Sequence, residues 1–203
     1  SGHTVFTSKH WDESKKDFTD AWKYTIEDAA TCGQQYVISP WLEEGKRKTA
    51  DDLKAFMDIF NKNGALCQKS GMKFGYHNHD FELDLLSDGR MALESILEDT
   101  NEDNVKAEFD VYWLKKAGEN PVEWIKKYNN RTPIIHLKDM TTDEEQFFAE
   151  LGTGGVDIEA VLNIGEEAGV QWWVVEQDFT RRTPFESIGM SINFLKTKLP
   201  HLA

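Results

Sequence analysis

Four residues of types that commonly bind divalent metals lie at the ends of short apolar segments. They are His77 in GYHNH, Asp110 in EFD, His136 in IIHLKD and Glu176 in VVEQD. The intervals between them are 33, 26 and 40 residues, lengths typical of one strand plus one helix. Because the carboxyl ends of parallel strands meet at one end of a barrel, this spacing predicts that the four side chains converge on one metal ion.

The alternation of side chains along a strand supports this convergence. His77 and His79 share one face of the segment 72–79, and Glu108 and Asp110 share one face of the next strand. A single histidine or aspartate at a strand end is more often a hydrogen-bonded core residue or a helix cap. Here four such residues occur on four successive strands, each on the strand face that would point into the barrel. This combination favours a metal site over a structural role for each residue.

Two imidazoles and two carboxylates make a mixed nitrogen and oxygen ligand set. This set suits manganese, zinc, cobalt or iron better than magnesium or calcium, which prefer oxygen alone. A bound ion could polarise a carbonyl while a nearby group takes a proton from the adjacent carbon. Isomerases, epimerases and some eliminations share that step.

Three residues are candidates for moving or stabilising the proton and charge. Glu176 could serve as both metal ligand and base, and His79 could be a second acid-base group because imidazole titrates near neutral pH. The alternative for His79 is outer support of a metal ligand. Lys138 could donate to a substrate oxygen, or it could form an ion pair with Asp178 or Glu108.

Further candidates lie just beyond strand ends. Trp113 could stack on a sugar ring, although buried packing is equally open. The glycine-rich segment 151–157 could hold an anion on two amides at a helix start, but a turn and a helix N-cap explain it as well. Arg181 and Arg182 could contact an anionic group or could be a solvated pair.

The elements that must position these residues alternate between strand and helix along the whole chain. Apolar periodicity predicts strands at 4–7, 35–39, 72–78, 105–110, 133–139 and 171–178, and helices at 14–33, 49–71, 91–99, from Pro121, 157–169 and 184–198. This alternation predicts a parallel α/β sheet or barrel and not a β-sandwich. The convergence of the four side chains at strand ends favours a TIM (β/α)8-type barrel. Since only six strands are counted, we expect a barrel that lacks its first two strand-helix units, in a chain truncated at its N-terminus.

The composition is that of one globular domain. A chain of 203 residues with 39% hydrophobic residues is long enough for one core, so we expect a single domain over 1–203. The net charge of −13 disfavours a nucleic-acid partner, because such partners require clustered lysine and arginine. No segment resembles a membrane span or a signal peptide, so a soluble protein is expected, with the cytoplasm and the periplasm both open.

Several motifs resemble the xylose isomerase-like TIM-barrel superfamily, the sugar phosphate isomerase/epimerase group. They are SGH at 1–3, PW at 40–41, GYHNHDFEL at 75–83, EFDVYW at 108–113, HLKDM at 136–140, ELGTGGVD at 150–157 and VVEQD at 174–178. The resemblance implies a divalent metal held by His77, Asp110, His136 and Glu176. It also implies that His3 is a histidine of the substrate pocket, and that the substrate is a small carbohydrate.

One position departs from the pattern of that superfamily. His77 stands where its epimerases have a glutamate, and those enzymes are thought to move a proton between two opposed glutamates. The resemblance therefore implies one-base chemistry, either a sugar isomerisation or a keto-sugar lyase or hydratase reaction.

Alternatives to that enzyme are a sugar-binding barrel without turnover and a nuclease similar to endonuclease IV, which the acidic charge disfavours. An incomplete barrel would expose a sheet edge, so we expect the chain to bind a missing segment, to pair with a second copy of itself or to be part of a longer protein.

Overall fold

The computed structural model describes residues 1–199, and its contacts divide the chain into two compact units, Ser1–Glu108 and Phe109–Ala203. We call them the first unit and the second unit and describe each by itself. The boundary falls within strand β6 (Val105–Asp110). The single domain expected from the sequence stays a prediction.

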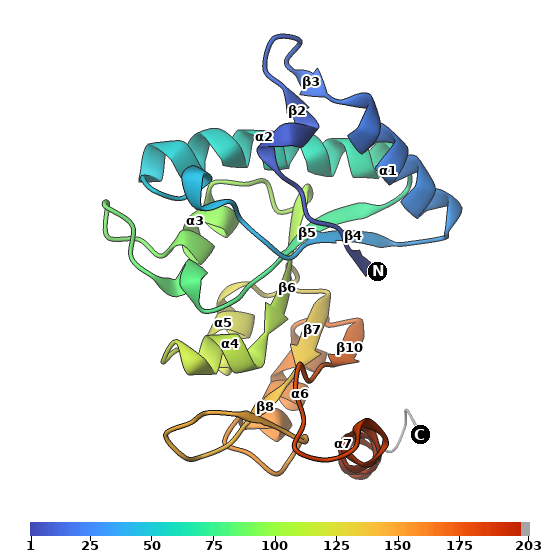
Figure 1. The fold of residues 1–203 in the computed structure, drawn as a ribbon, viewed down its shortest axis with the longest axis vertical. Helices are drawn as coiled ribbons and strands as arrows, with labels where there is room; N and C mark the ends of the chain where they lie inside the picture. Colours follow the sequence, from blue (N-terminus) through green and yellow to red (C-terminus); the bar gives the residue numbers. More distant parts are fainter. Residues whose placement is uncertain (200–203) are drawn as a thin grey trace. The chain divides into compact units, whose positions relative to one another are not determined.

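The first unit alternates parallel strands with helices. Its strands are β1 (Gly2–His3), β4 (Tyr36–Ser39), β5 (Lys73–His77) and β6, which pair side by side in this order. Its longer helices are α1 (Asp20–Thr31), α2 (Ala50–Lys69) and α3 (Ala92–Glu98), and its short 3-10 turns are η1 (Ser8–His10), η2 (Glu44–Lys46) and η3 (Phe81–Leu83). Helix α2 packs against β5 and α3 (Figure 1).

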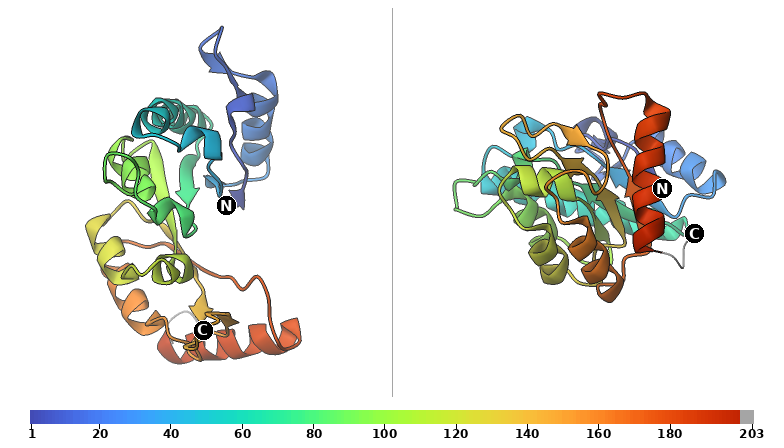
Figure 2. Two further views of the ribbon diagram at one scale, coloured as in Figure 1. Left: turned by 60° about the vertical axis from the view of Figure 1, so that its left-hand side comes forward. Right: turned by 90° about the horizontal axis from the view of Figure 1, so that it is seen from below.

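Two predictions near the N-terminus are wrong. Residues 4–7 are not a strand, because the strand ends at His3, and the helix expected at 14–33 begins only at Asp20. A hairpin of β2 (Trp11–Asp12) and β3 (Asp17–Phe18) takes the intervening residues and projects from the first unit in Figure 1 and in the left view of Figure 2. Its turn is fixed by the Asp12 carboxylate, which accepts from the backbone N–H groups of Ser14 and Lys15.

Aromatic rings form the core of the first unit. Phe6 is fully buried and its ring centroid lies 5.8 Å from that of Phe56 and 6.0 Å from that of Phe60, which in turn lies 5.2 Å from Phe74. Such pairs contribute about 0.5–1.5 kcal/mol beyond the area that they bury. The helical face predicted for α1 is confirmed, because Trp22, Ile26 and Ala29 are its buried residues.

The second unit begins with the end of β6 and continues the alternation. Its strands are β7 (Ile134–Leu137) and β10 (Trp172–Val175), which pair in parallel, and the antiparallel pair β8 (Asp139–Met140) and β9 (Phe148–Ala149). Its helices are α4 (Val111–Lys116), α5 (Pro121–Lys127), α6 (Ile158–Glu167) and α7 (Pro184–Lys198). Figure 2 shows α7 as the long helix near the C-terminus.

Local signals explain most helix boundaries. The predicted N-cap of α2 is confirmed, since the Thr49 hydroxyl accepts from the N–H of Asp52, and the start of α7 at Pro184 follows the capping residue Thr183. Asp157 accepts from the N–H of Ala160 at the start of α6, as predicted. Helix α4 was not predicted.

None of the helices in residues 1–199 has the length and hydropathy needed to cross a bilayer.

Gly64 provides a test of the packing in the first unit. A Cβ atom at Gly64 in α2 would overlap the backbone carbonyl of Asn104, whereas a Cβ at Gly189 in α7 would meet nothing within 4 Å. Gly64→Ala is therefore expected to lower the free energy of unfolding by about 1–3 kcal/mol. Gly189→Ala should leave it unchanged or raise it by up to about 1 kcal/mol, because alanine is the better helix former. Urea unfolding of both variants measures the difference, and equal effects would contradict the packing described here.

Candidate metal centre

Asp110 at the end of β6 combines two roles in one carboxylate. Its Oδ1 accepts from the backbone N–H groups of Tyr112 at 2.9 Å and Trp113 at 3.2 Å, so it is the N-cap of α4. Its Oδ2 lies 3.5 Å from Nζ of Lys138. The side chain is fully buried, and this burial raises its pKa to about 7 against the opposing effect of Lys138 and His136. A buried carboxylate of this kind gains stability from a nearby cation.

His136 and Glu176 lie next to each other because β7 and β10 pair in parallel. The register aligns Val174 with His136, so Glu176 follows just beyond it, and Nδ1 of His136 lies 2.7 Å from Oε2 of Glu176. One ligand atom from each of Asp110, His136 and Glu176 lies within 4.8 Å of the others. The second unit therefore brings together three of the four ligands that the sequence predicts.

This set fits a divalent ion. Metal–ligand distances of 2.0–2.2 Å at a tetrahedral angle put two ligand atoms about 3.4 Å apart. The ligand atoms of these three residues lie within 4.8 Å of one another, so they are close enough to share one ion. One imidazole nitrogen and two carboxylate oxygens are also the donors that transition metals accept. Asp110, His136 and Glu176 are the residues that would hold the ion.

Lys138 lies fully buried among carboxylates of the second unit. Its Nζ is 2.9 Å from Oδ2 of Asp178, 3.5 Å from Asp110 and 3.7 Å from Oε2 of Glu176. Burial lowers the pKa of this ammonium, but the three carboxylates outweigh burial and the pKa is raised. Lys138 is therefore a charged hydrogen-bond donor and not a base. Of the two ion-pair partners considered from the sequence, Asp178 is the one found in this unit.

Three aromatic rings lie near the ammonium of Lys138. The ring centroids of Tyr112, Trp113 and Phe148 lie 5.4, 5.1 and 5.0 Å from its Nζ. Cations are attracted to ring faces at such distances. The ring of Trp113 thus lies next to the ammonium of Lys138, and its predicted contact with a sugar stays a prediction.

His77 and His3 lie together in the first unit, and Glu108 joins them. Oε1 of Glu108 is 2.6 Å from Nε2 of His3 and 3.3 Å from Nδ1 of His77. His3 ends β1 and His77 ends β5. The expected role of His3 in a substrate pocket stays a prediction. Glu108 was not chosen as a site residue, although its position two residues before Asp110 put it on the same strand face. The role of His77 as a ligand of the same ion as Asp110 stays a prediction.

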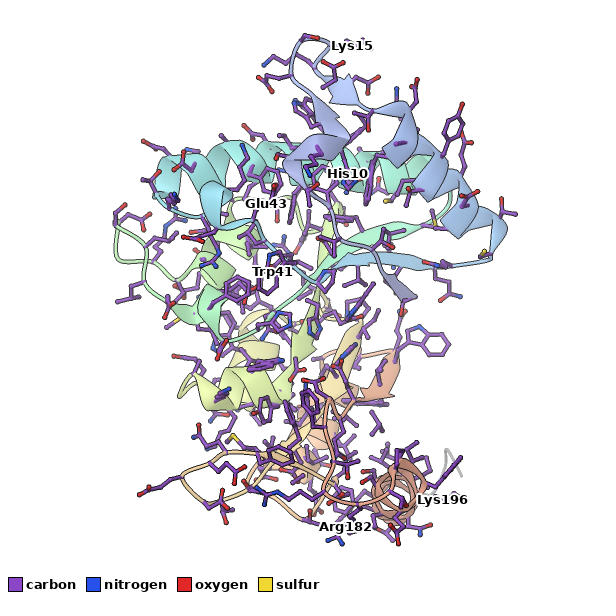
Figure 3. All side chains as sticks on the ribbon, in the orientation of Figure 1. His10, Lys15, Trp41, Glu43, Arg182 and Lys196 are labelled. Atoms are coloured by element: carbon purple, nitrogen blue, oxygen red, sulfur yellow. The ribbon has the colours of Figure 1, made fainter. Side chains whose placement is uncertain are left out.

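His79 follows β5 and is held in place by Glu82. The backbone N–H of His79 donates to Oε2 of Glu82 at 2.8 Å, and the hydroxyl of Tyr76 donates to Oε1 of the same carboxylate. The His79 ring stacks on Phe81 and meets Trp41 edge-on, a residue labelled in Figure 3. Glu82 is fully buried, and burial raises its pKa to about 7. Sequence reasoning missed Glu82, because a glutamate between Phe81 and Leu83 resembles an ordinary exposed position.

Comparison with known proteins gives the family of this fold. A family model described as xylose isomerase-like TIM barrel matches residues 2–198. An inosose dehydratase from Clostridium beijerinckii is 26% identical over 96% of this chain and 74% of its own length. The chain spans only 52–57% of seven further inosose dehydratases. All eight of these relatives are dehydratases, which are lyases.

Solved structures agree with this fold. A sugar phosphate isomerase/epimerase from Parabacteroides distasonis matches with a TM-score of 0.78 and 26% identity, over 92% of this chain and 68% of that one. The IOLI protein, solved with a bound zinc atom, matches with a TM-score of 0.68 over 88% of this chain and 68% of that one. Its identity is 19%, so this second likeness shows the fold alone.

The raised pKa of Glu82 predicts a dependence of stability on pH. The folded chain binds the proton of Glu82 up to about pH 7 and the unfolded chain only up to about 4.5. This stability is therefore complete below pH 4.5 and is lost as the pH rises through about 7. Glu82→Gln cannot titrate, so the difference in unfolding free energy between wild type and variant should change over this range. Urea unfolding across the range measures it, with the exposed Glu44→Gln as control. A difference that stays constant with pH would contradict the assignment.

Proposed function

Because the chain belongs to the xylose isomerase-like TIM barrel family, we propose that it is a metal-dependent enzyme that removes a proton next to a carbonyl of a small carbohydrate. The observation that carries this proposal is the convergence of Asp110, His136 and Glu176 within 4.8 Å of one another. The relatives are dehydratases and an isomerase/epimerase. The proposed reaction is accordingly a sugar isomerisation or epimerisation, or a loss of water from a keto sugar.

The proposed metal is manganese, zinc or cobalt, because one of its ligands is an imidazole. Bound by Asp110, His136 and Glu176, a divalent ion would supply positive charge that polarises a carbonyl or hydroxyl oxygen of the substrate. Asp110 contributes a carboxylate whose direction is already fixed by its hydrogen bonds to the start of α4.

Glu176 is the proposed base. Its side chain is 32% exposed, whereas Asp110 is fully buried, so of these two carboxylates Glu176 is the one that a substrate can reach. Its two oxygens allow one to accept a proton while the other faces the imidazole of His136. Lys138 keeps its proton and would donate a hydrogen bond to the substrate oxygen that gains negative charge as the proton leaves. His79 is proposed as the second acid-base group, and His3 and Trp113 as substrate contacts.

One-base chemistry is favoured because His77 replaces the second glutamate of the epimerases. With Glu176 as the only carboxylate base, the proton returns to a neighbouring carbon in an isomerisation. In an elimination, the hydroxyl group leaves from the carbon on the other side of the deprotonated carbon, one bond further from the carbonyl. It takes up a proton and departs as water, and a C=C bond forms between these two carbons. Both outcomes begin with the same proton transfer to Glu176, so both remain within the proposal.

Metal uptake is the first test. The chain purified without chelator should carry about one divalent ion, and His136→Ala or Asp110→Asn should weaken its binding by at least about a hundredfold. Calorimetric titration with zinc and manganese after chelation measures the affinities. Glu145→Gln is the matched control, since Glu145 is an acidic residue of the second unit that pairs with Arg181 and not with the three ligands. A metal-free protein in which His136→Ala changes nothing would overturn the proposal.

Proton exchange is the second test and separates the enzyme from a sugar-binding barrel. In deuterated water the metal-loaded chain should exchange the hydrogen next to the carbonyl of a keto sugar, with inosose and fructose as probes. Glu176→Gln should slow this exchange by at least about a hundredfold, because proton transfer to a placed base is worth about that much. Binding of a probe without any exchange would favour the binding protein, and binding of duplex DNA at low salt would favour a nuclease.

A further inference from the structure

The first unit contains its own cluster of metal-binding residue types, formed by His3, His77 and Glu108. Oε1 of Glu108 lies 2.6 Å from Nε2 of His3 and 3.3 Å from Nδ1 of His77. The ring centroids of the two histidines are 4.8 Å apart. One ligand atom from each of the three residues lies within 4.8 Å of the others. The first unit alone therefore gathers three ligand atoms in one small volume.

The parallel strands of the first unit hold this cluster in place. His3 ends β1, His77 ends β5, and Glu108 lies in β6, where the register aligns it with His77. Strand β1 pairs with β4, and the N-terminus marked in Figure 1 lies beside β4. Side chains on strands are positioned more precisely than side chains on loops. The convergence is therefore a property of the sheet and not of a surface loop.

The donor atoms of the cluster are those of a zinc site. Two imidazole nitrogens and one carboxylate oxygen are the protein ligands of one class of catalytic zinc centre, in which a fourth position stays open to water or substrate. Ligand atoms of one tetrahedral ion lie about 3.4 Å apart. Glu108 and His77 are already at this separation, and Glu108 and His3 must move apart by less than about 1 Å.

The burial of the three side chains leaves one side of the cluster accessible. The side chains of Glu108 and His77 are 1% and 3% exposed, whereas that of His3 is 36% exposed. A carboxylate enclosed to this degree has lost its hydration, so it gains stability from a nearby cation. His3 has room for the small movement that an ion requires, and its exposed side is the side from which an ion and a fourth ligand can reach the cluster.

The charge of the cluster differs from that of the candidate metal centre. The cluster supplies one negative charge, whereas the three ligands of the second unit supply two. Fewer carboxylates make the attraction of a divalent cation weaker. The second imidazole favours zinc and cobalt over manganese and magnesium. The cluster should therefore bind zinc more weakly than the candidate metal centre does, and with a greater preference for zinc over manganese.

We propose that His3, His77 and Glu108 bind a second divalent transition-metal ion, zinc above all, in addition to the ion of the candidate metal centre. His77 then acts as a metal ligand within its own unit, with His3 and Glu108 as the other two ligands. A substrate oxygen in the fourth position would bind the same ion, so His3 would contact the substrate through the metal. The second ion site does not depend on the reaction proposed above.

The number of zinc ions bound tests this site. Calorimetric titration with zinc after chelation should resolve two equivalents, the second with the weaker affinity. His3→Gln should weaken the second binding step at least about tenfold, because glutamine replaces a ligand, and should leave the first step unchanged. His10→Gln is the matched control, since His10, labelled in Figure 3, is a histidine of the same unit whose Nδ1 accepts from the N–H of Thr7. A single equivalent in the wild type, or a second equivalent that His3→Gln does not weaken, would overturn the proposal.

The imidazole ¹⁵N signals of the wild type locate the second ion and keep the test decisive if His3→Gln does not fold. The second equivalent of zinc should shift Nε2 of His3 and Nδ1 of His77 in a saturable way and should leave His10 unchanged. If neither His3 nor His77 responds, the cluster is only a hydrogen-bonded group and the proposal is wrong.

A variant of the other centre separates this proposal from the proposed function. His136→Ala, which should lose the first ion, should still bind zinc at the cluster of the first unit, with the same ¹⁵N shifts. One equivalent that is lost in both His3→Gln and His136→Ala would indicate a single shared ion and would contradict a second site. Absence of turnover or of proton exchange leaves these measurements unaffected, so the two proposals fail separately.

Discussion

The second unit depends on one electrostatic arrangement, a buried ammonium that faces three carboxylates. Lys138 neutralises only one of the charges of Asp110, Glu176 and Asp178, so the group keeps an excess of negative charge in a place that water reaches poorly. Burial, with a smaller contribution from Glu176, raises the pKa of Asp110 to about 7, so this carboxylate tends to take up a proton. A divalent cation relieves the same excess without a proton. The ion pairs of Lys138 and the metal binding that we propose would thus both follow from this excess of negative charge.

Much of this arrangement was predictable from residue types and strand periodicity. The parallel pairing of β7 and β10 carries His136 and Glu176 to neighbouring positions, and strand parity alone predicted that they point the same way. Five of the six predicted strands are confirmed, because apolar runs between glycine, proline and helix caps leave few other arrangements. The wrong predictions concern residues 4–18. The turn held by the Asp12 carboxylate replaces the first part of the predicted helix, although the apolar pattern of that helix extends from Trp22 toward the N-terminus.

The residues that sequence reasoning missed are carboxylates whose partners are backbone groups or lie far away in the chain. Glu82 accepts from the amide of His79, Asp139 from four amides, and Glu108 meets His3 across 105 residues. Nothing in the residue type of a glutamate or aspartate marks it as buried. Burial of each is decided by the folded backbone around it, which supplies the N–H donors that replace water. Helix α4 was missed for a related reason, since its start depends on Asp110 as a helix cap, a role that was considered and set aside in favour of a metal ligand.

The double role of Asp110 constrains which substitutions evolution can accept at this position. A residue there must reach back to the amides of Tyr112 and Trp113 and must also direct an oxygen toward Lys138. Asparagine keeps the cap but loses the charge, and glutamate keeps the charge but is one methylene too long for the same cap geometry. Only aspartate satisfies both demands. A change of chemistry in a descendant of this protein is therefore easier at Glu176 or Lys138, where no helix start depends on the side chain.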